Sequence, residues 1–166
     1  MPEKKTLERA EEDRREGKSP STQAGEFVRE EFEHVREGKH GVRSPKQAIA
    51  IGLSKARRAG VDLPAPKAGT TSEKTRASAE HAYKAGKKGK KRTSSRRARA
   101  ASGALKREPR STASKSAISK QAKSAARRRG ASARSATARK AVRTKGAAGR
   151  SAAARKAART RTRKRR

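Results

Sequence analysis

The sequence predicts a mostly α-helical protein, with a small helical-hairpin head and a long, largely disordered tail of short marginal helices rich in Lys, Arg and Ala. Three observations predict this class. The 166 residues include 33 alanines but only 16 larger apolar residues, too few for one core that spans the chain. Twelve of those 16 lie in residues 1–63. Residues 1–63 carry 14 basic and 12 acidic side chains, whereas residues 64–166 carry 35 basic and three acidic ones.

The change of composition divides the chain into three parts. Residues 1–63 form a small α-helical head, and residues 64–72 form a linker with two prolines and a Gly/Thr/Ser cluster. Residues 73–166 form a cationic tail of low complexity, in which Ala and Ser alternate loosely with Lys and Arg. We therefore expect the compact structure to lie in the head.

Three helices are expected in the head, at about residues 6–16, 20–37 and 45–59. Gly17 and Gly38 are placed to end the first two, because glycine readily takes the left-handed conformation that follows a helix. The second helix has an apolar stripe at spacings of three and four, as one helix face requires. The stripe consists of Ala24, Val28, Phe32 and Val35, with Phe27 beside it. The acidic residues of the same helix are expected to be solvated on its opposite face. They are Glu30, Glu31, Glu33 and Glu37.

The third helix has the strongest start signal in the sequence. Ser44 at the N-cap, Pro45 at the first helical position and Gln47 at the third make a capping box. One side of this helix carries small and apolar residues, namely Ala48, Ile49, Gly52, Leu53 and Ala56. Two amphipathic helices joined by a short loop most simply pack as an antiparallel hairpin.

The tail favours helix but lacks large apolar residues. Helical segments are predicted at residues 73–85, 94–108, 112–129 and 131–145, each ended by a glycine or a proline. Helices this short are marginal in water, and their positive charges repel one another. We therefore expect the tail to remain largely disordered until a polyanion neutralises it.

The charge of the tail predicts binding to nucleic acid. Each Lys or Arg set against a phosphate releases a condensed counterion, so affinity does not require a fixed shape. The tail has one aromatic residue, Tyr83, and this disfavours base stacking on single strands. Sequence-independent binding to the backbone of duplex DNA fits better. The candidate contacts are Arg127, Arg128, Arg129, Arg134, Arg139, Lys140, Arg143, Arg155, Lys156, Arg159, Arg161, Arg163, Lys164, Arg165 and Arg166.

A second phosphate site is predicted in the head. The start of the third helix presents free backbone N–H groups and a partial positive charge. Lys39, Arg43 and Lys46 surround that end, together with His40. The alternative is a capped surface helix with no ligand.

Several classes of function have no support in the sequence. The chain has no cysteine, and His34, His40 and His81 are not at metal-ligand spacing with one another, so no metal or other cofactor is predicted. A core this small leaves no room for a closed catalytic pocket, and we expect no enzyme activity. No apolar segment approaches the about 20 residues of a membrane span, so no membrane association is expected. Association with RNA or the ribosome stays open. An adaptor role, in which the head binds a protein partner or itself, also stays open.

The segment GKSPSTQAGEFVREEFEHVREGKHGVRSPKQAIAIGLSKARRAGVDLP resembles a family of small, basic, functionally uncharacterised bacterial proteins. The resemblance covers about residues 1–64 and depends on the stretches STQAGEFV and SPKQAIAIGLSKARRAG. It implies a bacterial source and a cytoplasmic, nucleoid-associated location, and it implies no activity or catalytic residue. The tail is similar in composition to bacterial histone H1-like proteins and to the C-termini of linker histones.

Overall fold

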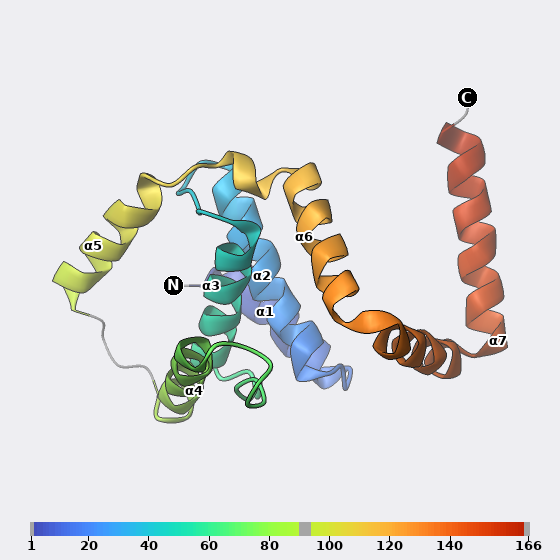
Figure 1. Ribbon diagram of the computed structural model, residues 1–166, viewed down its shortest axis with the longest axis horizontal. Coiled ribbons are helices and arrows are strands. Elements are labelled where there is room, and N and C mark those ends of the chain that lie inside the picture. The colour runs from blue at the N-terminus through green and yellow to red at the C-terminus, as the bar shows by residue number, and fades with distance from the viewer. Residues whose placement is uncertain (1, 90–93, 165–166) are drawn as a thin grey trace. The chain divides into compact units, whose positions relative to one another are not determined.

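The computed structural model describes residues 2–89 and 94–164, and within these ranges helices are the regular structure and no strand is present (Figure 1). The helices are α1 (Lys4–Arg15), α2 (Pro20–Arg36), α3 (Pro45–Arg58), α4 (Glu73–Lys87), α5 (Ser95–Lys106), the short 3₁₀ helix η1 (Ser111–Ala113), α6 (Lys115–Arg128) and α7 (Gly130–Lys164). The prediction of a mostly α protein is confirmed. The three helices expected in the head are present, with ends shifted by no more than two residues. Of the described helices, none is both long and apolar enough to cross a membrane.

The hairpin of α2 and α3 holds two small apolar clusters. In the first, Phe32 and Val35 of α2 pack with Ala48 of α3, with Val42 from the connecting loop and with Ala113 from η1. In the second, α2 and α3 meet α1, and the buried residues are Ala10, Ala24, Phe27 and Ala56. The predicted apolar stripe of α2 therefore faces the core. Phe27, which was predicted beside this stripe, is buried in the core as well and is 1% exposed.

Two glycines allow neighbouring helices to approach closely. A methyl group on Gly52 of α3 would lie 2.6 Å from the Cα of Val28 on α2. A methyl group on Gly86 of α4 would lie 2.0 Å from the carbonyl oxygen of Arg57 on α3. Both distances are far below a normal carbon contact, so α2, α3 and α4 pack backbone to backbone at these points.

The expectation of a largely disordered tail is wrong for the described residues, because most of them are helical. The helix α4 packs on α3 and buries Ala79 and Ala82, and Ala113 joins the apolar cluster of the hairpin. Small side chains suffice here because close approach lets backbone and Cβ atoms make the contacts. For α7 the physical reason is the high helix propensity of Ala, Arg and Lys, which here outweighs the repulsion between spaced cations.

The helix ends in the tail follow the predicted signals in part, because α4 continues past Gly86 to Lys87 and the helical residues after Gly146 were not predicted. Gly130 and Gly146 both have positive φ, and Gly146 breaks α7 into two helical segments where a helix end is predicted. The predicted helix 112–129 is divided at Ser114, which is extended and whose hydroxyl accepts a hydrogen bond from Ala117 N–H at 3.3 Å. Ser114 thus begins α6 as an N-cap.

The boundary between compact units does not coincide with the change in composition. The chain divides by its internal contacts into Met1–Gln121 and Ala122–Arg166. The first unit thus holds the hairpin together with α4, α5 and η1. Residues 64–72 contain no helix, as expected for the linker, and Arg57 fixes their start by donating a hydrogen bond to the carbonyl of Pro64 at 3.3 Å.

Candidate nucleic-acid interface

The loop between α2 and α3 is fixed by hydrogen bonds to the end of α5 and the segment after it. Gly41 N–H donates to the carbonyl of Leu105 at 2.9 Å, and Val42 N–H donates to the carbonyl of Pro109 at 3.0 Å. The hydroxyl of Thr112 donates to the carbonyl of Val42 at 2.8 Å. These bonds bring basic residues from the tail next to the loop that carries the predicted phosphate site.

At the start of α3 only the Ser44 half of the predicted capping box forms and occupies one backbone N–H group of the helix, because the Gln47 side chain binds the N–H of the residue before the N-cap. Ser44 Oγ accepts from Gln47 N–H at 3.3 Å, and Gln47 Oε1 accepts from Arg43 N–H at 2.8 Å. The guanidinium of Arg43 also lies 3.3 Å from a carboxylate oxygen of Glu108. Lys46 is exposed and makes no ion pair within the described residues. The anion site at this helix end therefore stays a prediction, and the guanidinium of Arg43 is already paired with Glu108.

A second cationic surface lies beside the same loop. An open depression of about 270 Å³ is lined by Gly38, Lys39, His40, Gly41, Lys106 and Arg110. Lys39 Nζ lies 2.8 Å from Glu3 Oε1 and 3.0 Å from Glu37 Oε2. In the described part of the chain, neither Lys106 nor Arg110 has a carboxylate partner. Sequence reasoning missed these two because they follow the loop by more than 60 residues.

The pKa of the Glu3 carboxyl shows how strongly Lys39 and His34 act on it. Lys39 and His34 each form a hydrogen bond with this carboxylate at 2.8 Å, and together they lower its pKa to about 2. Glu3 is therefore ionised at every physiological pH, and it holds Lys39 at the rim of the depression. A phosphate bound there would compete with Glu3 for the Lys39 ammonium.

The cations predicted in the tail lie on α6 and α7. Arg127 and Arg128 lie at the end of α6, Arg129 lies in the turn that follows it, and Arg134, Arg139, Lys140, Arg143, Arg155, Lys156, Arg159 and Arg161 lie along α7. The side chains of Arg163 and Lys164, and the residues Arg165 and Arg166, lie outside the described part of the structure.

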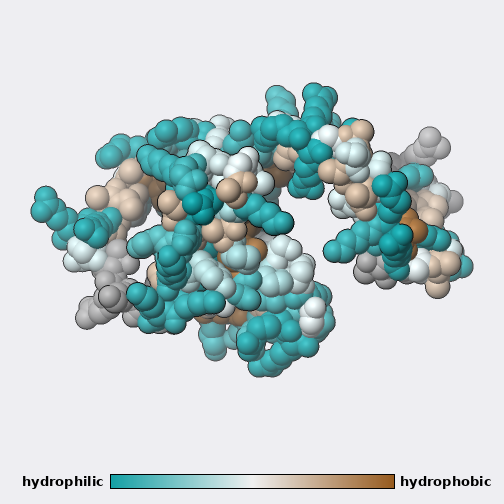
Figure 2. Space-filling model, turned by 60° about the horizontal axis from the view of Figure 1, so that its bottom comes forward, coloured by the Kyte–Doolittle hydropathy of each residue, from teal (hydrophilic) through white to brown (hydrophobic). Residues whose placement is uncertain are grey.

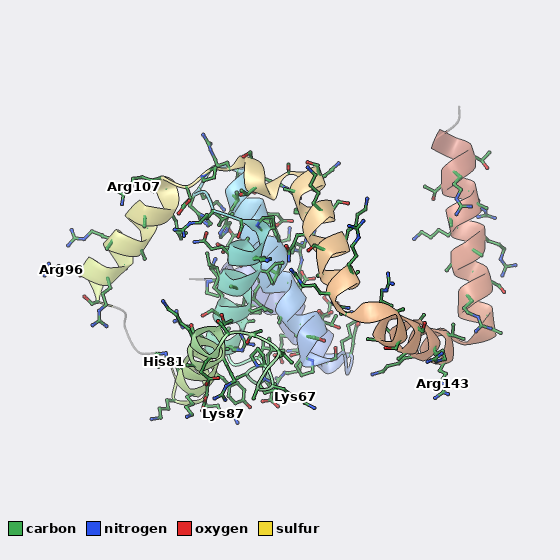
Figure 3. All side chains as sticks on the ribbon, viewed as in Figure 1. Lys67, His81, Lys87, Arg96, Arg107 and Arg143 are labelled. Carbon is green, nitrogen blue, oxygen red and sulfur yellow. The ribbon has the colours of Figure 1, made fainter. Side chains whose placement is uncertain are left out.

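All described side chains of α7 are exposed to solvent. Figure 3 shows Arg143 pointing away from this helix, and Arg96 and Arg107 pointing away from the ribbon at α5. Hydrophilic side chains also cover most of the face of the molecule drawn in Figure 2. No acidic residue follows Glu108 in the sequence, so α7 carries no acidic side chain of its own. A helix of this kind can take up phosphates on every side.

Two carboxylates of α2 are buried, which corrects the expectation that the acidic face of this helix is solvated. Glu30 is 3% exposed and Glu31 is fully buried. Lys55 of α3 compensates them, because its Nζ lies 3.2 Å from Glu30 Oε1 and 2.7 Å from Glu31 Oε2. Burial raises the pKa of Glu30, but hydrogen bonds from Thr6, from Glu3 N–H and from Lys55 outweigh it, so the net pKa is lowered.

Two histidines lie beside these carboxylates, although sequence reasoning found no ligand spacing among the histidines. His40 Nε2 lies 3.3 Å from Glu31 Oε1, and the ring centroids of His34 and His40 are 6.1 Å apart. The signal in the sequence was a Glu and a His three residues apart, Glu31 and His34, followed by a glycine turn and a further His. His81 lies on α4 and is not part of this group.

Comparison with known proteins gives one match. Residues 5–68 match a family of unknown function (DUF6496). This supports an uncharacterised domain over the helices α1, α2 and α3, and the match does not extend to α4 or beyond. No curated protein and no solved structure matches the chain.

Proposed function

We propose that this protein binds duplex DNA without sequence preference, in a histone H1-like, nucleoid-associated role, by neutralising phosphates with the cations of its tail. The observation that carries the proposal is the charge of residues 64–166, with 35 basic and three acidic side chains. The exposure of every described side chain of α7 supports it further. No catalytic step is part of the proposed role.

The charge density of α7 suits a phosphate backbone. After the break at Gly146, residues 147–164 carry seven Lys and Arg. At about 1.5 Å per residue this segment is about 27 Å long, so it presents a cation about every 4 Å. Duplex DNA presents a phosphate charge about every 1.7 Å of its axis, so each of these cations can find its own phosphate.

The first unit adds a candidate anchor. Lys106 and Arg110 line the depression beside the α2–α3 loop, and they have no carboxylate partner among the described residues. A single phosphate fits the positive charge and the size of this depression. We propose that the depression contacts the DNA backbone while α7 supplies most of the electrostatic affinity.

The test compares two variants with the same net charge. The tail variant carries Arg134→Gln, Arg139→Gln, Arg150→Gln and Arg155→Gln in α7. The head variant carries Lys4→Gln, Arg14→Gln, Arg15→Gln and Arg29→Gln, four exposed cations that each pair with a carboxylate of their own helix. Affinity for a duplex of random sequence is measured by fluorescence anisotropy between about 50 and 200 mM salt.

We expect the slope of log K against log salt to become shallower by about 3.6 in the tail variant, because each lost phosphate contact removes about 0.9. The head variant should change the slope by less than about 1, because its cations are already paired. Equal effects of the two variants would contradict binding through the tail. Competition with a structured RNA of equal length tests the choice of polymer, and a preference for RNA would contradict duplex DNA.

A further inference from the structure

Three side chains with metal-ligating atoms meet at the end of α2. Glu31, His34 and His40 each offer one ligand atom, and these atoms all lie within 4.8 Å of one another. Glu31 and His34 share a face of the helix because they are three residues apart. His40 reaches the same place because Gly38, with a φ of 81°, turns the chain back after the helix.

The carboxylate of Glu31 is ion-paired with Lys55 but lacks hydrogen bonds of normal geometry. The residue is fully buried, and neither oxygen has a partner with hydrogen-bond geometry. Lys55 Nζ lies near Oε2, at 2.7 Å, but off the direction of a hydrogen bond. Buried carboxylates in folded proteins are normally hydrogen-bonded or bound to a metal ion, so this one has unused capacity to accept a ligand.

The tautomer of His40 points to a cation between the ring and this carboxylate. His40 Nδ1 lies 3.0 Å from the carbonyl oxygen of Gly41, and a carbonyl can only accept, so Nδ1 carries the hydrogen. In the neutral ring, Nε2 is then a bare lone pair, and it lies 3.3 Å from Glu31 Oε1. Two lone pairs that face each other require a proton or a metal ion between them.

The outer contact of His40 has the pattern found around bound metals. Ligating histidines usually donate their second ring N–H to a carboxylate or to a backbone carbonyl. His34 Nε2 lies 2.8 Å from Glu3 Oε1, and His40 donates to Gly41. These contacts orient the rings and leave one nitrogen of each neutral ring without a hydrogen.

We propose that Glu31, His34 and His40 bind a divalent transition-metal ion, with Zn²⁺ as the ion that this donor set fits best. Two imidazoles and one carboxylate are a typical set of three protein ligands for zinc, with a fourth position for water. Ligand distances of about 2.0–2.2 Å place donors about 3.3 Å apart in a tetrahedron, so side-chain rotation has to close part of the present separation.

The ion would join α2 to the loop that carries Gly41 and Val42, and these two residues hold the segment after α5. Binding is therefore expected to stabilise the first unit. His40 also lines the open depression, so an ion can reach the site from solvent. The proposal does not depend on DNA binding, because none of the three ligands contributes to the charge of the tail.

The test is a titration of the full chain, freed of metal by chelation, with ZnCl₂ alone, followed by isothermal calorimetry. We expect one ion per chain, and at least tenfold weaker binding in Glu31→Gln and in His40→Gln. The matched control is His81→Gln, which removes an exposed histidine outside the cluster and should bind as the unmodified protein does. Far-ultraviolet circular dichroism shows whether each variant is folded.

A second measurement uses the unmodified protein, so it stands even if a variant fails to fold. Long-range proton–nitrogen NMR spectra of the histidine rings should show one ring nitrogen of His34 and one of His40 shifting on addition of zinc, with His81 unchanged. Absence of stoichiometric binding would overturn the proposal. Shifts confined to His81, or equal affinity in His40→Gln and the unmodified protein, would overturn it as well.

Discussion

Lys55 lies within ion-pair distance of two buried carboxylates, and its replacement gives the sharpest test of the packing of α2 on α3. Its Nζ lies 3.2 Å from Glu30 Oε1 and 2.7 Å from Glu31 Oε2. The side chains of Glu30 and Glu31 are 3% and 1% exposed, whereas that of Lys55 is 22% exposed. The change Lys55→Met keeps most of the apolar stem and removes only the charge.

Removal of one partner of a buried ion pair costs about 3–5 kcal/mol, because a charge is left without compensation. Lys55 is partly exposed, so we expect the lower value, a loss of about 3 kcal/mol in the free energy of unfolding at pH 7. The assay is urea denaturation of metal-free protein, followed by circular dichroism and by hydrogen exchange in peptides from α2 and α3. Hydrogen exchange in these peptides reports the stability of α2 and α3 separately from that of the exposed helix α7.

The effect of Lys55→Met on stability should depend on pH, because Glu30 is titratable. In the unmodified protein the pKa of Glu30 is below its ordinary 4.5, so its ionisation stabilises the fold above pH 4.5 and this contribution is lost as the pH falls through the lower folded value. In Lys55→Met, burial is no longer offset by the ammonium, and the pKa of Glu30 rises. The difference in stability between the two proteins should therefore narrow as the pH falls through the two folded pKa values of Glu30, by about 1.4 kcal/mol for each unit by which that pKa is higher in the variant.

The double variant Glu31→Gln/Lys55→Met tests the same reasoning, since it removes one carboxylate together with the cation. It should recover at least part of the lost stability. A loss below about 1 kcal/mol in Lys55→Met would refute the reasoning, because surface ion pairs lie in that range. A difference between the two proteins that stays constant with pH would refute it too.

Two further predictions concern helix packing and helix starts. Gly52→Ala should lower the free energy of unfolding by about 1–3 kcal/mol, because its methyl group would meet the backbone of Val28. The matched control is Gly25→Ala on α2, where an added methyl group would have no other atom within 4 Å. This control should raise the free energy of unfolding by about 0.5–1 kcal/mol in the same urea titration. Ser44→Ala should cost about 1 kcal/mol, because its hydroxyl caps α3, whereas Ser19→Ala should cost less than half of that, because the Ser19 side chain makes no hydrogen bond to the backbone of α2. Equal losses at Ser44 and Ser19 would contradict the assigned cap.

Local signals in the sequence were sufficient to place most helices up to residue 145, whereas the helical segment after Gly146 was not predicted. Ser44 with Pro45 began α3, Gly17 and Gly38 ended α1 and α2, and Gly146 broke α7, because caps and left-handed glycines act within a few residues of the chain. The apolar stripe of α2 was also visible, since its spacing of three and four is a property of one helix. The charge of the tail follows from the numbers of its basic and acidic residues, and the DNA-binding proposal depends mainly on this charge.

The tertiary structure decided which residues of different helices and loops lie in contact. The contact of residues 105–113 with the α2–α3 loop joins positions more than 60 residues apart, and no local pattern marks it. The burial of Glu30 and Glu31 was hidden because a carboxylate looks like a surface residue unless the position of Lys55 is known. The alanines of α4 did not indicate that this helix packs on α3. The contact depends on close backbone packing at Gly86, which only the structure shows.

The sequence by itself therefore determined most of the helices up to residue 145 and the strong positive charge of the tail, because each of these follows from neighbouring residues or from composition. Only the tertiary structure placed Glu31, His34 and His40 within one cluster and set Lys106 beside Lys39. The physical reason is that such groups depend on the distance between elements in space, and this distance is fixed by packing that the order of residues along the chain does not state.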